Sequence, residues 1–308
     1  MRAFLFPGQA SQYVGMAADL YSEFEIVREY FDKADDILNM DLKRTCFNGP
    51  DEKLVRTEYT QPAIFVHSVA VDAILRKVGF RPQLAAGHSL GEYSALVSAG
   101  VLSFEDGLKT VKLRSQLMQK CCDEYPGTMA AIVGLSYDKV KDVVNDIDGV
   151  VPANYNSPEQ VAISGFTHSV ETACDKLKET GAKRAIMLAV SGAYHSPQMQ
   201  YAKEKMAEYI NSLEFGKFDF PVIANVTAEA VDNPAKIKSL LCEQIISPVL
   251  WYPSILLMMK KGVREFYEVG PGKVLKGLLK RFLKGEQYSI FNLDKVEQVN
   301  IVIGAEVG

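Results

Sequence analysis

The sequence predicts an α/β protein with a mainly parallel sheet, helices on both faces of that sheet, and a smaller ferredoxin-like unit inserted into it. Two observations lead to this prediction. Towards both ends of the chain, short apolar segments alternate with stretches of helical periodicity, which is the pattern of parallel strands joined by helices. The middle of the chain has the order strand, helix, strand, strand, helix, strand, which is typical of a ferredoxin-like unit. A length of 308 residues is enough for both.

The first part of the larger unit contains two apolar segments that end in glycine-containing turns. Residues 3–6 end at the turn PGQASQ, and residues 84–86 lead into GHSLG, so both are predicted to be buried strands. Helical spacing and capping residues predict helices that begin near Met16 and cover residues 61–78, 92–99 and 103–122.

A change in character at EYPG, residues 124–127, indicates the start of the inserted unit. Its strands are expected at residues 129–133, 150–154, 160–164 and 185–190, and its helices at 137–147 and 170–180. We therefore expect a ferredoxin-like domain at residues 126–195, inserted into an α/β domain made of residues 1–125 and 196–308.

The α/β pattern resumes at Ser196-Pro197, which predicts a helix start because proline is favoured at the first helical position. Strands are expected at residues 221–226 and 263–269. The second of them is followed by the turn GPG and by a basic helix at residues 273–284.

Composition narrows the possible partners. A net charge of -4 argues against a surface built for nucleic acid. The five cysteines lack CxxC spacing and the four histidines are scattered, so no metal site is expected and the cysteines fit a reduced, cytoplasmic protein. The apolar run at residues 249–259 is short and broken by Pro253, and no signal peptide is evident, so no membrane association is expected.

Ser89 lies between two glycines in the pattern Gly-x-Ser-x-Gly, where a predicted strand meets a predicted helix. Small residues on both sides permit a sharp turn that lifts the hydroxyl off the sheet and beside the N–H groups that open the helix. This is the geometry of a nucleophile. The pattern alone is equally compatible with a tight turn that contains a capping serine.

A serine nucleophile needs a base. His195 follows the strand predicted at residues 185–190 and directly precedes a helix start, and such junctions carry the site residues of open α/β sheets. We interpret His195 as the base, with a buried structural histidine as the alternative. Structural positions are expected for the other histidines: His67, His88 beside the turn, and His168.

Arg114 is predicted to lie on or beside the apolar face of its helix, three residues after Val111 and three before Leu117. A buried arginine is costly unless it is paired, and no acidic residue lies three or four positions away. Its planar guanidinium would suit a carboxylate from elsewhere, including one from a substrate. The alternative is an arginine that packs its stem and keeps its head in water.

These residues belong to a longer series of motifs, and with them the chain resembles the malonyl-CoA:acyl carrier protein transacylases and the acyltransferase domains of fatty-acid and polyketide synthases. The resemblance covers essentially the whole chain. It rests on FPGQASQ at 6–12, TQPAIF at 60–65, GHSLGEYSAL at 87–96, the Arg114 helix, NYNSP at 154–158, SGAYHSPQM at 191–199, SPVLW at 247–251 and EVGPGKVL at 268–275.

The resemblance implies a larger domain similar to an α/β-hydrolase core and a ping-pong transfer of malonyl from malonyl-CoA to the phosphopantetheine thiol of acyl carrier protein, without a cofactor of the enzyme's own. It implies Ser89 as nucleophile, His195 as base and Arg114 as the partner of the malonyl carboxylate. The oxyanion hole would be formed by the backbone N–H groups of Gln9 and Leu90. A main-chain carbonyl, that of Leu250, would orient the histidine.

Two departures and one selectivity feature accompany the resemblance. Ala10 stands where many members have glycine, and Leu250 where glutamine or arginine is frequent. Leu90 and the Tyr194-His195 pair resemble the malonyl-selective pattern, in which an aromatic ring fills the volume that an α-methyl group would need. Such a steric difference is modest, on the order of 1–3 kcal/mol.

The helix predicted at residues 273–284 carries five basic residues and no acidic one. Either this is an ordinary solvated face, or it attracts acidic carrier protein or the phosphates of coenzyme A. The residues concerned are Lys273, Lys276, Lys280, Arg281 and Lys284.

Two other functions fit the sequence less well than acyl transfer. A serine hydrolase or thioesterase of the related fold would place its histidine late in the chain, whereas no histidine follows His195 here. A non-catalytic carrier-binding subunit predicts that the nucleophile or the base is lost, whereas both are present.

Overall fold

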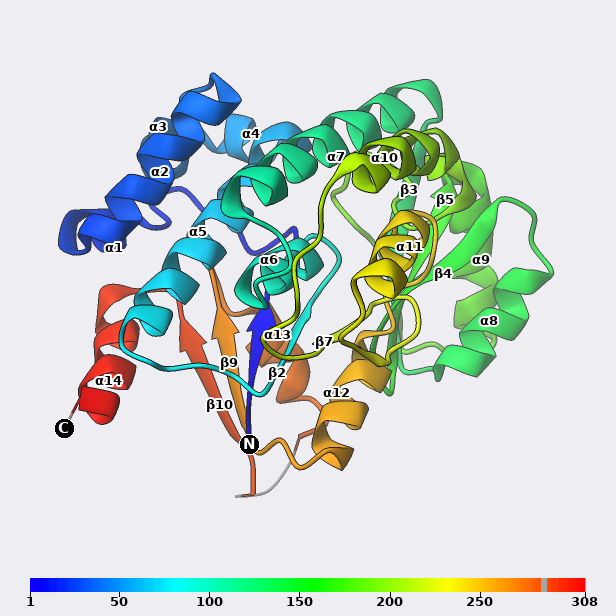
Figure 1. The fold of residues 1–308 in the computed structure, drawn as a ribbon. Coiled ribbons are helices and arrows are strands. Elements are labelled where there is room, and N and C mark those ends of the chain that lie inside the picture. Colours follow the sequence, from blue (N-terminus) through cyan, green and yellow to red (C-terminus); the bar gives the residue numbers. More distant parts are fainter. Residues whose placement is uncertain (284–286, 308) are drawn as a thin grey trace.

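The computed structural model describes residues 1–283 and 287–307, which fold around two separate sheets (Figure 1). The larger sheet has the order β10-β9-β1-β2-β7-β8 and the smaller one the order β4-β5-β3-β6. The predicted combination of a mainly parallel sheet and a ferredoxin-like unit is confirmed.

The larger sheet is parallel except at one edge, where β8 pairs antiparallel with β7. Its central strand β1 is buried on both faces, which explains its continuous apolar sequence. Phe4 and Phe6 point into one hydrophobic cluster, and Ala3 and Leu5 into another. The strands are β1 (Arg2–Phe6), β2 (Leu84–Gly87), β7 (Val222–Ile223), β8 (Ala230–Val231), β9 (Glu265–Val269) and β10 (Ser289–Leu293).

Helices cover both faces of this sheet (Figure 1). The cluster around Phe4 and Phe6 is closed by α1 (Ala18–Glu23), α2 (Glu25–Leu38), α3 (Leu42–Asn48), α4 (Asp51–Leu54), α5 (Thr57–Lys77), α6 (Gly91–Ser98), α7 (Phe104–Glu124), α10 (Gln200–Ser212), α11 (Pro234–Gln244) and α14 (Val296–Val307). The cluster around Ala3 and Leu5 is closed by α12 (Trp251–Lys260) and α13 (Val274–Leu279).

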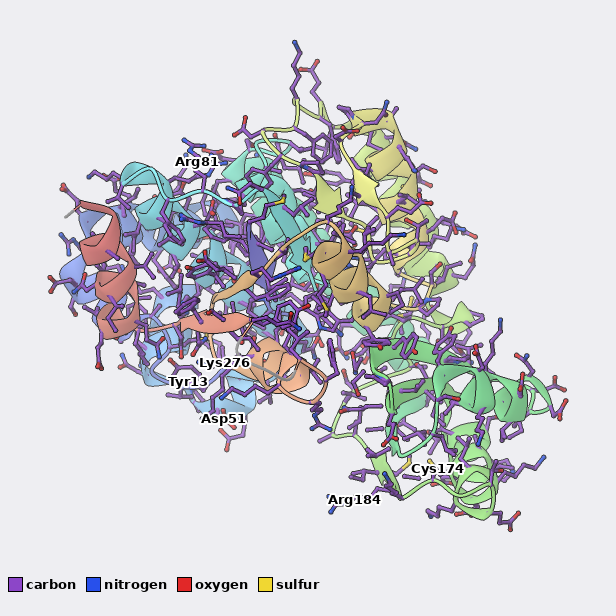
Figure 2. All side chains as sticks on the ribbon, turned by 90° about the horizontal axis from the view of Figure 1, so that it is seen from below. Tyr13, Asp51, Arg81, Cys174, Arg184 and Lys276 are labelled. Carbon is purple, nitrogen blue, oxygen red and sulfur yellow. The ribbon has the colours of Figure 1, made fainter. Side chains whose placement is uncertain are left out.

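The smaller sheet is antiparallel throughout and has its own hydrophobic cluster. In Figure 2 it lies to one side of the larger sheet, with Cys174 and Arg184 far from Tyr13 and Asp51. Its elements are β3 (Gly127–Val133), α8 (Tyr137–Asn145), β4 (Val150–Ser157), β5 (Gln160–Phe166), α9 (Thr167–Glu179) and β6 (Arg184–Met187). All of them fall within residues 126–195, the segment for which an inserted domain is predicted.

Three predicted elements are clearly shorter in the structure. The basic helix expected at residues 273–284 is the single short helix α13, and Lys284 lies outside the described residues. The strand expected at 185–190 belongs to the smaller sheet, as predicted, but it ends at Met187. The strand expected at 221–226 covers only Val222–Ile223. No helix in the described part of the chain is both long and apolar enough to cross a bilayer.

Candidate active site

Ser89 occupies a sharp turn between β2 and α6. Its φ of 51° is in the left-handed region, which is uncommon for a residue with a side chain. A Cβ atom on Gly87 would lie 1.8 Å from the carbonyl carbon of Gly91, and one on Gly91 would lie 2.1 Å from the carbonyl oxygen of Phe6. Both glycines are therefore required for the strand, the turn and the helix to approach this closely.

The Ser89 hydroxyl contacts a histidine and an arginine. Its Oγ lies 2.8 Å from Nε2 of His195, and it accepts a hydrogen bond of 2.9 Å from a terminal nitrogen of Arg114. Nδ1 of His195 lies 2.9 Å from the carbonyl oxygen of Gln244 and 3.2 Å from that of Ser247. Since carbonyls only accept, the ring proton is on Nδ1, and Nε2 is free to accept the serine proton.

The carbonyl expected to orient His195, that of Leu250, does not do so. It accepts hydrogen bonds from the backbone N–H and the hydroxyl of Ser254, and so belongs to the first turn of α12. The histidine is oriented instead by the last residue of α11, Gln244, and by Ser247. Carbonyls at the C-terminal end of a helix lack intrahelical partners, which leaves that of Gln244 available.

His195 is almost fully buried, with 3% of its surface exposed. Burial, assisted by the positive charge of Arg114, lowers the pKa of His195 to about 3. The imidazole is therefore neutral near pH 7 and can act as a base. His195 also has a left-handed backbone, with a φ of 57°, in the connection that leads from the smaller sheet to α10. The strand that precedes His195, β6, belongs to the smaller sheet, so His195 reaches Ser89 from that side and not from an edge of the larger parallel sheet.

Arg114 is buried, with 1% of its surface exposed, and the alternative of a solvated head is wrong. Among the residues that the structure describes, its two terminal nitrogens donate to three neutral groups: Oε1 of Gln61 at 2.8 Å, the Ser89 hydroxyl, and Oε1 of Gln244 at 3.1 Å. Its Nε has no hydrogen-bond partner within the described residues. The guanidinium therefore lies beside Ser89 with its charge paired to no carboxylate among these partners, which suits an anionic substrate group.

Gln9 and Leu90 both line the cavity above Ser89. Leu90 immediately precedes α6, and no acceptor for the backbone N–H of either residue is found in the described part of the chain. The N–H of Ser89 itself is not available, because it donates to Oδ1 of Asn225 at 2.8 Å. Ala10, the departure from glycine noted above, has a φ of 81°, so this loop keeps a conformation that glycine adopts at lower cost.

The cavity has a volume of about 240 Å³ and lies between the two sheets. Its base is formed by the Ser89 turn, and its walls come from β3 and β5 of the smaller sheet and from α13. Apolar residues predominate in the walls: Met118, Met129, Ala131, Ala162, Leu188, Val190, Val274, Leu275 and Leu278. The ring of Tyr194 also lines it, and its hydroxyl is held by Thr57 at 2.9 Å and Ser191 at 2.6 Å.

The basic residues predicted for docking surround α13 at the edge of this cavity. Lys273, Lys280 and Arg281 are exposed, and Lys276 is partly buried on α13 (Figure 2). The buried carboxylate of Glu268 accepts the backbone N–H groups of Leu275 and Lys276 at 2.9 and 2.8 Å. A glutamate from β9 thus anchors the helix start that carries the positive charges.

Sequence reasoning missed several polar residues that surround Ser89. Gln61, Asn225 and Gln244 all contact the Ser89–His195–Arg114 group through hydrogen bonds. Only Gln61 falls within a recognised motif, TQPAIF; the others lie in segments with no distinguishing local pattern. Their role can be recognised only from the hydrogen bonds that they form in the folded protein.

Comparison with known proteins agrees with this geometry. Residues 3–301 match the model of the acyl transferase domain family. The chain belongs to that family. It is 44% identical over 283 residues to the malonyl CoA-acyl carrier protein transacylase of Bacillus subtilis, and the aligned region covers 91% of this chain and 89% of that relative.

Solved structures of the family superimpose closely. An acyl carrier protein S-malonyltransferase from Vibrio cholerae has a TM-score of 0.93 and 41% identity, and the match covers 98% of this chain and 99% of that one. A malonyl-transacylase in complex with a type II polyketide acyl carrier protein has a TM-score of 0.94 and 39% identity, with 99% of both chains covered.

Proposed function

We propose that this protein transfers a malonyl group from malonyl-CoA to the phosphopantetheine thiol of an acyl carrier protein, through an acyl-serine intermediate, in fatty-acid or polyketide synthesis. The observation that carries the proposal is the contact of one hydroxyl, that of Ser89, with both a neutral base and a buried arginine. The names of the relatives and the solved complex with a carrier protein support the same reaction.

In the first half-reaction, Nε2 of His195 accepts the proton of Ser89 as Oγ attacks the thioester carbon of malonyl-CoA. Negative charge develops on the former carbonyl oxygen, where the N–H groups of Gln9 and Leu90 stabilise it. The carbon–sulfur bond then breaks, and the coenzyme A sulfur leaves with the proton from His195. Arg114 binds the malonyl carboxylate throughout.

The second half-reaction is the reverse with a different thiol. The carrier's phosphopantetheine sulfur gives its proton to His195 and attacks the malonyl-serine carbonyl. Collapse of the tetrahedral intermediate breaks the carbon–oxygen bond, and Ser89 regains its proton from His195. In both half-reactions the acid–base and hydrogen-bonding groups are side chains and backbone N–H groups of the enzyme.

Two further parts of the proposal concern the surroundings. The basic residues around α13 attract the acidic carrier protein to the edge of the cavity. The protein acts in the cytoplasm, which the five free cysteines support because disulfides are scarce in reducing compartments.

The proposal is tested by detecting a covalent malonyl adduct on the protein. Wild-type protein incubated with malonyl-CoA should gain one malonyl group on Ser89 by mass spectrometry and pass it to carrier protein. Ser89→Ala should fold, show no adduct and transfer at least about 10³-fold more slowly. His195→Ala should slow both half-reactions, since one base serves both. Release of free malonate as fast as transfer would instead indicate a hydrolase.

A further inference from the structure

The carboxylate of Glu92 is buried directly behind the Ser89 turn. Only 1% of Glu92 is exposed, and the residue does not line the cavity. Its Oε2 accepts a hydrogen bond of 2.7 Å from Nε2 of Gln244, and its Oε1 accepts one of 3.3 Å from the backbone N–H of Asn225. A buried carboxylate is costly, so its presence behind a reactive serine needs a reason.

The two partners of Glu92 hold the backbone of Ser89 from both sides. Asn225 accepts from the N–H of Ser89 at 2.8 Å and donates to the carbonyl of Gly87 at 2.7 Å. Gln244 donates to the carbonyl of Ser89 at 2.8 Å. The strained, left-handed backbone of Ser89 is therefore fixed at its N–H by one partner of Glu92 and at its carbonyl by the other.

Gln244 also contacts both of the charged or titratable side chains that face Ser89. Its side-chain oxygen accepts from Arg114 at 3.1 Å, and its backbone carbonyl accepts from Nδ1 of His195 at 2.9 Å. The ionised carboxylate of Glu92 and the carbonyl of Ser89 both accept from the amide nitrogen of Gln244, so the amide oxygen is turned towards Arg114. Glu92 thereby helps to fix the direction of a hydrogen bond to the guanidinium.

Burial raises the pKa of Glu92 to about 7, although the hydrogen bonds from Gln244 and Asn225 and the charge of Arg114 oppose the rise. In its ionised form Glu92 provides negative charge close to Arg114 without touching it. The direct partners of Arg114 are neutral, and Gln244 stands between the guanidinium and the carboxylate. Such a relay stabilises the buried cation and leaves its donors free to exchange a neutral partner for a substrate carboxylate.

We propose that Glu92 is a positioning residue for acyl loading: through Gln244 and Asn225 it holds Ser89 in its reactive conformation and directs Arg114 towards the acyl carboxylate. The inference rests on the proposed function, because it assigns Glu92 a role in that same reaction. It predicts that losing the carboxylate slows loading of Ser89 and reduces the preference for malonyl over acetyl groups.

The primary variant is Glu92→Gln, which keeps the size of the side chain. The oxygen of its amide can accept from only one of the two donors, Gln244 or Asn225. The NH2 group of the amide then faces the N–H of the other donor, and these two donors cannot form a hydrogen bond with each other. Malonyl loading of Ser89, followed by mass spectrometry, should fall by about tenfold or more. Acetyl loading should fall less, because it depends on the Ser89 backbone but not on Arg114.

Asp72→Asn is the matched control. Asp72 is also buried, and its carboxylate accepts from the hydroxyl of Ser98 at the other end of α6, away from the cavity. Asp72 lies on α5, so this substitution removes a second buried carboxylate that contacts α6 but belongs to a neighbouring helix. It should lower the melting temperature but leave the ratio of malonyl to acetyl loading as in the wild type.

Glu92→Met provides a second route if the glutamine variant does not fold, since it removes the carboxylate without adding an unpaired donor. It should show the same loss of malonyl preference. A wild-type ratio in either folded variant would overturn the proposal. So would the failure of both to fold while Asp72→Asn folds, because Glu92 would then be structural. Absence of any adduct in the wild type would contradict the proposed function itself.

Discussion

The charge of Arg114 is the residue-level property on which acyl selection depends in the proposed reaction. The guanidinium is buried, donates to Gln61, Ser89 and Gln244, and has a pKa lowered by that burial. A buried cation whose direct partners are neutral gains most from an anionic ligand, since the low local dielectric strengthens the attraction. A malonyl thioester carries such an anion, whereas an acetyl thioester does not.

Arg114→Ala should therefore reduce malonyl loading by about 100-fold, the effect of losing two charge-assisted hydrogen bonds. Acetyl loading should fall less, or even rise, because the buried unpaired cation is gone. Arg114→Lys should lie between, since a lysine retains the charge but not the planar fork. The measurement is the ratio of malonyl to acetyl loading rates, with the fold checked by circular dichroism. An unchanged ratio in Arg114→Ala would make Arg114 a structural residue.

Among the secondary-structure elements, α13 connects the cavity with the protein surface. Leu275 and Leu278 face the cavity, while Lys273 and Lys280 flank the helix and are exposed. The short helix keeps its position because Glu268, from the neighbouring strand β9, accepts its first N–H groups. Basic residues held at the edge of the cavity can orient an acidic carrier as its thiol enters.

Reversal of two of these charges, Lys273→Glu with Lys280→Glu, should raise the KM for carrier protein by roughly five- to tenfold at low salt, because it removes electrostatic attraction. The effect should shrink at high salt, where charges are screened. Lys260→Glu with Lys261→Glu is the control: it changes net charge equally at exposed residues beside Met1, at the opposite end of β1. Equal KM values for the two double variants at low salt would favour an ordinary solvated face.

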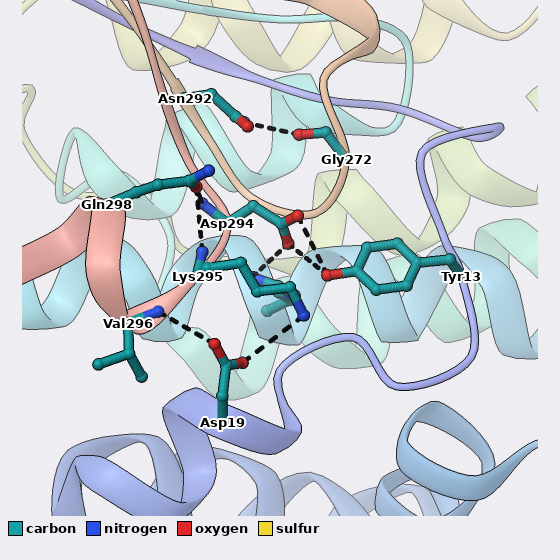
Figure 3. A network of polar contacts seen from close by, with 9 residues as sticks. Tyr13, Asp19, Gly272, Asn292, Asp294, Lys295, Val296 and Gln298 are labelled. Atoms are coloured by element: carbon teal, nitrogen blue, oxygen red, sulfur yellow. Dashed lines mark hydrogen bonds and ion pairs between the residues drawn. The ribbon is translucent and has the colours of Figure 1, made fainter.

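At the scale of the whole molecule, a polar network joins the two ends of the larger unit (Figure 3). The hydroxyl of Tyr13 donates to Asp294, and the carboxylate of Asp19 accepts the N–H of Val296 at 3.1 Å. On α5, His67 is fully buried, and its Nε2 lies 3.6 Å from Asp294. The loop that follows Gln9 is thus tied to the segment that follows β10.

His67 makes this network sensitive to acid. Burial lowers the pKa of His67 to about 3, against 6.5 for an ordinary histidine. As the pH falls below 6.5, the unfolded chain takes up a proton at this residue and the folded chain does not, so stability falls. At pH 5 this one residue should cost about 2 kcal/mol relative to pH 7.5.

The check compares thermal unfolding of wild type and His67→Phe at the two pH values. Between pH 7.5 and 5 the variant should lose less stability than the wild type by about that amount. Other buried groups titrate equally in both proteins and cancel. The exposed His168, replaced in His168→Ala, is the control and should leave the acid sensitivity unchanged. Equal losses in wild type and His67→Phe would mean that His67 is protonated in the folded protein.

The sequence by itself determined those features of the structure that depend on residues close together in the chain. Gly87, Ser89 and Gly91 produce the turn because any side chain at either glycine would collide with backbone. Apolar runs determined the central strands, and the spacing of Val111, Arg114 and Leu117 put the arginine on the buried side of its helix.

Only the tertiary structure decided which distant groups complete the site. The carbonyl that orients His195 belongs to Gln244, 49 residues away, and not to Leu250, which the motif had indicated. Asn225 reaches Ser89 across 136 residues of sequence. No local pattern encodes such contacts, because they depend on how α11 and the segment after β7 pack against the Ser89 turn. Periodicity and steric limits act within a few residues, whereas hydrogen bonding between remote segments is settled by the packing of the whole chain.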